Sequence, residues 1–271
     1  MKILSFLIVF GAIAAACERI TPSNPSENST FPQGKWIDLT YTIDSTTLYW
    51  PNNATGFEHI VDFQGVTPKG FYYTSYKMCT PEHGGTHIDA PIHFAEGKWT
   101  VDEIPLEQTT GEGVVIDVSK KALKNRDYQI TSEDLVAWEK TNGAIPTNAI
   151  VFFKTGYGKF YPNRKEYFGT DLKGEAAIPQ LHFPGISPEA AQWIVENRKI
   201  KAFGLDVASM DYGQSTDFKT HQILLGHQIP GFENVANLDQ LPTKGFYVVA
   251  LPMKIGKGSG APLRLAAFIK S

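Results

Sequence analysis

The chain has 271 residues, of which 42% are hydrophobic and 20% are charged, and its formal net charge is -3. This composition is typical of an ordinary globular protein that is long enough to bury one sizeable core, so we expect a single folded domain. A weakly negative chain without a block of Lys and Arg argues against nucleic acid and anionic membrane surfaces as partners.

The first 17 residues have the features of a secretory signal. A basic start precedes an apolar stretch, which ends in small residues and Cys17. The stretch is a signal and not a membrane-spanning helix. Its Ala-Ala-Ala-Cys ending resembles a bacterial lipobox, in which Cys17 would carry lipid, and a plain cleaved signal is the alternative. We therefore expect an exported protein, either anchored to the bacterial membrane by lipid or free in the periplasm or outside the cell.

Residues 18–34 follow as a polar segment rich in Ser, Asn, Pro and Thr. Such a composition cannot bury a core, so it predicts a flexible tether. The catalytic domain would then comprise residues 35–271. If Cys17 is lipidated, the only other cysteine is Cys79, and no disulfide can form within the domain.

Past the tether, short apolar runs between turn signals predict a β-rich core. We expect strands at residues 35–40, 70–77, 113–118, 149–155, 202–206, 245–251 and 263–269. Helices are fewer. Thr131 and the acidic residues after it predict a helix start before an apolar stripe, and Ser187 followed by Pro188 predicts the start of a second helix. The pattern indicates a mixed α/β domain without internal repeats.

Residues 81–94 hold three of the chain's seven histidines. His83, His87, Asp89 and His93 all fall on odd positions, so in an extended chain they project from the same face. Two glycines and a proline in the run oppose a helix. Imidazoles and a carboxylate that converge can bind a divalent metal, and a further imidazole nearby can move protons. The alternative is a surface histidine cluster without a function.

This run resembles the signature of the cyclase-type metal-dependent hydrolases, the family that includes bacterial kynurenine formamidase and isatin hydrolase. Two later stretches add to the resemblance. Residues 206–211 and 221–234 are similar to the family's second conserved block, and residues 258–264 are similar to its closing segment. The likeness covers roughly residues 36–269. It implies a β-rich core of the swivelling β/β/α type with helices packed around it.

The resemblance also implies the metal ligands. It gives a first metal to His83, His87 and Asp89, and it gives Asp89 as a bridge to a second metal that His221 and Glu233 complete. Ligands that are all nitrogen or oxygen suit zinc or manganese. We therefore expect one or two Zn²⁺ or Mn²⁺ ions per chain.

Two further residues take roles from the resemblance. His93 matches the family's proton donor and acceptor, and an imidazole titrates near neutral pH and can move protons there. A third metal ligand or a structural histidine is the alternative. Trp50 matches a tryptophan that contacts the aromatic substrate in kynurenine formamidase. The match departs at Asn52-Asn53, where the formamidase pattern prefers Gly-Asp, so the substrate stays open.

Other residues carry weaker signals. Asp206 and Asp211 match family positions, and we expect them to be structural or to orient ligands. His182 and His227 are as consistent with a structural role as with a functional one, and His59 is expected at the surface. Four neighbouring aromatic residues are expected either to line the pocket or to lie in the core: Phe71, Tyr72, Tyr73 and Tyr76.

Together these patterns predict a hydrolase of carbon-nitrogen bonds in an amide or a cyclic amide or imide, with a small molecule as substrate. One alternative is a surface lipoprotein that binds metal or a ligand without turnover, and His93 argues against it because a binding protein needs no proton shuttle. Another is lactone hydrolysis or ring closure at the same site. The resemblance also implies a homodimer. Kynurenine formamidases are usually cytosolic, so an exported relative is expected to act on a different compound.

Overall fold

A computed structural model describes residues 32–53 and 55–271, and one compact unit spans Gly34–Ser271. The predicted signal, Cys17 and most of the tether lie outside the described residues. Within those residues, no helix has both the length and the apolar composition needed to cross a membrane.

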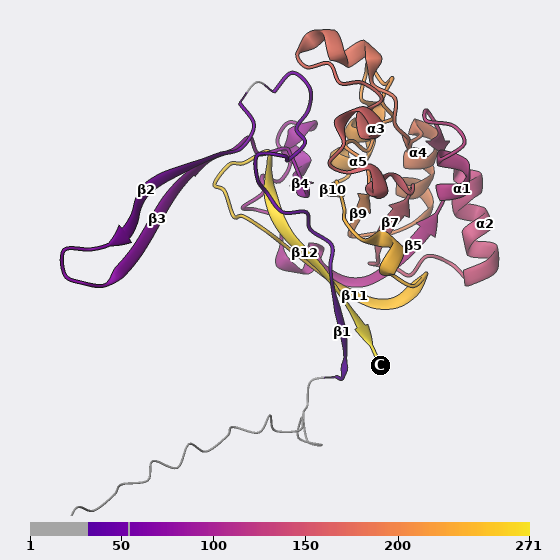
Figure 1. Cartoon of the computed structure of the whole chain (residues 1–271). Coiled ribbons are helices and arrows are strands. Elements are labelled where there is room, and N and C mark those ends of the chain that lie inside the picture. Colours follow the sequence, from indigo (N-terminus) through magenta and orange to yellow (C-terminus); the bar gives the residue numbers. More distant parts are fainter. Residues whose placement is uncertain (1–31, 54) are drawn as a thin grey trace, which may run out of the picture. The chain divides into compact units, whose positions relative to one another are not determined.

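The described residues form twelve strands and five α-helices (Figure 1). The strands are β1 (Gly34–Asp38), β2 (Glu58–Val66), β3 (Tyr72–Cys79), β4 (His87–Asp89), β5 (Thr110–Asp117), β6 (Gln129–Ile130), β7 (Ile150–Lys154), β8 (Gly185–Ile186), β9 (Ala202–Leu205), β10 (Gly231–Glu233), β11 (Lys244–Pro252) and β12 (Gly260–Lys270). The helices are α1 (Ser119–Ala122), α2 (Ser132–Asn142), α3 (Arg164–Phe168), α4 (Pro188–Asn197) and α5 (Lys219–Gly226). Every predicted strand overlaps an observed one.

Eight strands form one sheet in the order β1-β12-β11-β5-β7-β9-β10-β4, and β4 also pairs with β12. The pairing of β4 with β12 closes all of these strands except β1 into a barrel-like ring of seven strands, and β1 pairs with β12 outside the ring. The strands β5, β7, β9 and β10 run parallel, whereas the other neighbouring pairs are antiparallel. The α/β class expected from the sequence is therefore confirmed.

Successive residues of the central strands point to opposite sides of the ring wall and enter two different cores. Val115 on β5 and Phe152 on β7 belong to a cluster that draws residues from all eight strands of the sheet, so this cluster fills the ring. Their neighbours Val114 and Val151 belong to a second cluster shared with α2, α4 and α5. Figure 1 shows these helices gathered beside β5, β7 and β9. Burial on both sides explains the nearly unbroken apolar runs of these strands.

Both predicted helix starts are confirmed. The hydroxyl of Thr131 accepts a hydrogen bond from the backbone N–H of Asp134, and the Asp134 carboxylate accepts one from the N–H of Thr131. At α4 the hydroxyl of Ser187 accepts from the N–H of Ala190, and Pro188 occupies the first turn. These contacts satisfy backbone donors that a helix leaves unpaired at its start.

A hairpin of β2 and β3, which we call the arm (residues 58–79), pairs with none of the other described strands. Nearly all of its residues are exposed, and Figure 1 shows it extending away from the ring. The sequence suggested that the aromatic residues here lie in the core or line the pocket. Both expectations are wrong, because the arm carries apolar side chains on both faces and no described element covers either: Phe71, Tyr72, Tyr73 and Tyr76 are 54%, 62%, 50% and 40% exposed.

Candidate metal centre

The short strand β4 fixes the first part of the site. It lies between β10 and β12, so it is held on both edges. His87 and Asp89 point to one face, while Ile88 between them points into the core that fills the ring. In the antiparallel pairing His87 lies opposite Glu233 on β10. Opposite residues share a face, so the pairing itself brings Glu233 beside His87.

His83 reaches the same place by a turn and not along one extended strand. The chain bends at Gly84-Gly85, and Gly85 has a φ of 56°, which a glycine adopts without strain. A side chain at position 84 would collide with the ring of Tyr49, and one at Gly260 would collide with the ring of His83. The expected convergence of ligands is thus present, but the pleat accounts only for His87 and Asp89.

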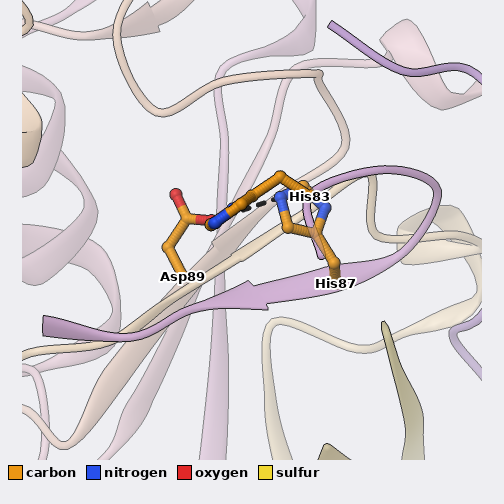
Figure 2. Close-up of side chains that lie close together, drawn as sticks. All are labelled: His83, His87 and Asp89. Atoms are coloured by element: carbon orange, nitrogen blue, oxygen red, sulfur yellow. Dashed lines mark hydrogen bonds and ion pairs between the residues drawn. The ribbon is translucent and has the colours of Figure 1, made fainter. Parts of the chain in front are cut away.

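Four side chains meet around Asp89. Its Oδ1 lies 2.7 Å from His83 Nδ1 and 3.2 Å from His87 Nε2, as Figure 2 shows in part, and its Oδ2 lies 3.4 Å from His221 Nε2. Glu233 spans the same two sides, with Oε2 3.6 Å from His87 Nε2 and Oε1 3.7 Å from His221 Nε2. Each carboxylate therefore directs one oxygen towards His87 and the other towards His221.

Hydrogen bonds behind the imidazoles fix their orientation. Asp211 accepts a hydrogen bond from His221 Nδ1 at 2.5 Å and another from the His221 backbone N–H at 3.1 Å. The carbonyl of Gly85 lies 3.0 Å from Nδ1 of His87. Both contacts leave Nε2 directed into the cluster, as a metal ligand requires. Asp211 thus fixes the orientation of the His221 imidazole.

His83 has a support that the sequence did not reveal. Its Nε2 lies 2.9 Å from the hydroxyl of Ser259, and this hydroxyl donates to Glu82 at 2.7 Å. Ser259 lies in the closing segment, which resembles the family but carried no role in the sequence. The pairing of β4 with β12 brings the two together.

The cluster is nearly closed to solvent, and its charges shift one another. Burial opposes ionisation of Asp89, but the neighbouring imidazoles of His83, His221 and His87 outweigh burial and hold its pKa well below the usual range. Burial and the charge of Asp89 raise the pKa of Glu233. Two buried carboxylates at this spacing call for positive charge between them. A divalent cation with nitrogen and oxygen ligands fits that need.

The cluster forms the floor of a cavity of about 260 Å³. His93, on a single turn of 3-10 helix (Pro91–His93), lines it with its ring stacked on His83 at 3.9 Å. In the metal-free chain, burial lowers the pKa of His93 to about 4, below the neutral range expected from the sequence. Aromatic and aliphatic side chains complete the lining: Leu48, Tyr49, Trp50, Phe94, Phe168 and Phe218.

Apart from Trp50, the remaining sequence candidates lie outside the cavity. His182 pairs with Asp127, and His227 is exposed at the end of α5. His59 is exposed on the arm, as expected. Asp206 is buried, where it accepts hydrogen bonds from the residues that follow β7, so its role is structural. Among these candidates, only Trp50 faces the cavity.

Comparisons with known proteins agree with this geometry. Residues 37–212 match the Cyclase family, whose description is "Putative cyclase". An isatin hydrolase of Roseibium aggregatum is 29% identical over an alignment of 247 residues, and the match covers 84% of this chain and 91% of that protein. A kynurenine formamidase of Salinibacter ruber is 27% identical over 228 residues, 84% of this chain and 94% of that protein.

Solved structures show the same likeness. Isatin hydrolase A from Labrenzia aggregata, bound to benzyl benzoate, superposes with a TM-score of 0.78 at 34% identity, over 88% of this chain and 94% of that chain. An isatin hydrolase bound to the product analogue thioisatinate gives a TM-score of 0.77 at 27% identity, over 88% of this chain and 93% of that one.

Proposed function

The chain belongs to the cyclase family, and from this premise we propose that it is a metal-dependent hydrolase of the carbon-nitrogen bond in an aryl or cyclic amide. One observation carries the proposal: His83, His87, His221 and Glu233 converge on Asp89 at the floor of an aromatic-lined cavity. The relatives named isatin hydrolase and kynurenine formamidase support a hydrolase. For the fold we propose the swivelling β/β/α type.

The residues fit one or two divalent cations, and we propose Zn²⁺ or Mn²⁺. His83, His87 and Asp89 would hold the first, while Asp89, His221 and Glu233 would hold the second. All donors are nitrogen or oxygen, which suits both metals. When bound, a divalent cation supplies Lewis-acid chemistry, because it polarises a carbonyl and makes water more acidic.

The chain's own residues would move the protons and hold the substrate. Hydrolysis places the hydroxyl of water on the carbonyl carbon and a proton on the departing nitrogen. In the metal-free chain, burial lowers the pKa of His93 to about 4 and so favours the neutral imidazole, which has no side-chain hydrogen-bond partner among the described residues. Its imidazole is therefore free to accept the proton of water and return it to the nitrogen. Trp50 and the other cavity rings would hold the apolar part of the substrate.

Turnover separates this proposal from a metal-binding lipoprotein. Metal-loaded protein should hydrolyse at least one of isatin, N-formylkynurenine, hydantoin and simple imides. His93→Ala should keep its metal but lower kcat by about 10²- to 10⁴-fold, the usual contribution of a positioned acid or base. Loss of metal in this variant would make His93 a ligand. Full activity would remove the proton shuttle.

We propose further that two copies of the chain pair through the arm. Its acidic Glu58 and Asp62 balance its basic Lys69 and Lys77, so it carries no excess charge that would favour nucleic acid or anionic lipid. Exposed apolar side chains on both faces favour a protein surface. A second exposed apolar surface on β11, with Tyr247 and Leu251, offers a match on another copy. Such reciprocal contacts are typical of two-fold dimers.

For localisation we propose export with lipid on Cys17. The apolar leader, the Ala-Ala-Ala-Cys ending and the polar segment after it support this assignment. Cys17→Ser should move the protein from the membrane fraction to the soluble fraction, measured after cell fractionation. Wild-type protein that is soluble and begins downstream of Cys17 would exclude the anchor.

A further inference from the structure

The start of α5 departs from two local rules. Phe218 is its N-cap residue, with φ 51° and ψ 42°, and its own side chain makes no capping hydrogen bond. The carboxylate of Asp211 instead accepts from the backbone N–H groups of Thr220 and His221 in the first turn. Helix N-caps are normally extended residues with a short polar side chain that accepts a backbone hydrogen bond. A bulky residue in the left-handed region is a backbone outlier. Phe218 therefore differs from the usual N-cap residue in both its side chain and its backbone conformation.

The other non-glycine residues with positive φ in the described chain differ from it. Three of them are asparagines, which tolerate this conformation, and the remaining two are Gln228 and Lys257. Phe218 is the only aromatic among these described residues. Strained residues persist where their surroundings determine them, and they gather at functional sites.

The surroundings of Phe218 are tied to the metal cluster. Its backbone N–H donates to the hydroxyl of Ser215 at 3.2 Å, and this hydroxyl donates to Asp211 at 3.2 Å. The same Asp211 holds His221. One carboxylate therefore fixes both a metal-cluster imidazole and the turn that presents Phe218.

The ring of Phe218 lies against the cavity's other rings. Its centroid is 5.5 Å from that of Phe94, 6.2 Å from that of Trp50 and 5.8 Å from that of His221. All four residues line the cavity. A planar ring can contact such a wall by edge or by offset stacking, whereas a small aliphatic group leaves it largely uncovered.

We propose that Phe218 is a specificity-determining residue. Its ring, held by a left-handed backbone, completes the aromatic wall beside the metal cluster and selects amides attached to a planar ring over small aliphatic ones. The inference rests on the proposed function, because it names the substrate class of the same cavity. The proposal also gives a reason for the strained backbone at Phe218, which the metal cluster alone does not require.

The test compares three substitutions at this position. Phe218→Asn accepts the left-handed backbone but lacks the ring, Phe218→Leu keeps apolar bulk without planarity, and Phe218→Tyr keeps the ring. For isatin, kcat/KM should fall about 10- to 100-fold in the Asn variant, less in the Leu variant and little in the Tyr variant, and the ratio of kcat/KM for isatin to that for succinimide should fall in the same order. Isatin binding to the metal-free protein, measured by calorimetry, should weaken in the same order.

Lys257→Asn is the matched control, because it relaxes a positive φ at an exposed residue outside the cavity. It should leave both substrates unaffected. An unchanged ratio of kcat/KM for isatin to that for succinimide in Phe218→Asn overturns the inference. Should the Asn variant not fold, equally tight isatin binding in the Leu and Tyr variants overturns it. Metal-loaded wild-type protein that binds isatin through Phe218 but hydrolyses none of isatin, N-formylkynurenine, hydantoin and succinimide refutes the proposed function and leaves the assignment of Phe218 standing.

Discussion

The arm and the β4 segment are neighbours in the sequence but opposites in their surroundings. The arm ends at Cys79, and although it is rich in apolar residues, nearly all of them are exposed. Residues 84–90 follow, and all are buried, His87 and Asp89 included. Hydrophobicity alone would predict the reverse. The difference teaches that available partners decide burial. The charged groups around β4 pair with one another, whereas no described element covers the arm.

The largest expected effect comes from removing a partner in the buried segment. His87→Ala should lose most of its bound metal and nearly all turnover. It should also lose the metal-linked stabilisation, about 4 kcal/mol when free metal is a thousandfold above Kd. Elemental analysis and thermal unfolding measure both effects. His59→Ala on the exposed arm is the control and should change neither. Equal metal content in His87→Ala and wild type would contradict the ligand assignment.

A smaller effect is expected from protonation in the metal-free protein. Burial lowers the pKa of His93 to about 4, whereas in the unfolded chain it lies near 6.5. Between these values the unfolded state binds a proton that the folded state does not. The stabilisation is therefore complete above pH 6.5 and is lost as pH falls towards 4, by roughly 3 kcal/mol at most.

His93→Gln should remove this part of the pH dependence, which chemical unfolding at a series of pH values would measure. His59→Gln on the arm should retain the wild-type slope. If His93→Gln and wild type lose stability in parallel between pH 6.5 and 4, the imidazole is not held neutral by burial.

The smallest effect on stability is expected in the arm. Val61→Lys with Tyr76→Lys changes two side chains that face each other across its strands. Both are exposed, so the free energy of unfolding of one chain should change by no more than about 0.5 kcal/mol per site. The dimer should nevertheless dissociate, as light scattering of the domain would show. Val136→Lys, exposed on α2, is the control. If the double variant remains a dimer, the interface lies elsewhere on the chain. If the wild-type domain is a monomer, the proposed dimer is wrong.

Much of the fold could be predicted from the sequence because the buried strands are apolar runs between turns. The missed elements lack such a signal. Charged residues interrupt β2, including Asp62 at an irregularity in the pairing, and β10 has only three residues. The helix α5 begins at Phe218, which gives no capping pattern. Capping and periodicity patterns predict elements whose ends and faces follow local sequence preferences, so they do not predict this helix.

The site could be predicted in part. Alternation along the chain pointed to His87 and Asp89, and the family resemblance supplied His221 and Glu233. The support of His83 by Ser259 could not be predicted, because it depends on two segments that meet only when the sheet closes. The lowered pKa of His93 could not be predicted either. Burial sets it, and burial is a property of the folded chain.

The closure of the ring at β4 has a consequence for the order of folding. Asp89 lies opposite Gly231 on β10 and Gly260 on β12, partners that the chain supplies only near its end. Contacts so distant in sequence form slowly, because a long loop must close before they are gained. The residues of the candidate metal centre are therefore expected to meet late, and a chain that stops before β12 cannot assemble them in this way. We expect metal to slow unfolding far more than it speeds folding, because it can bind at this site only once these contacts have formed.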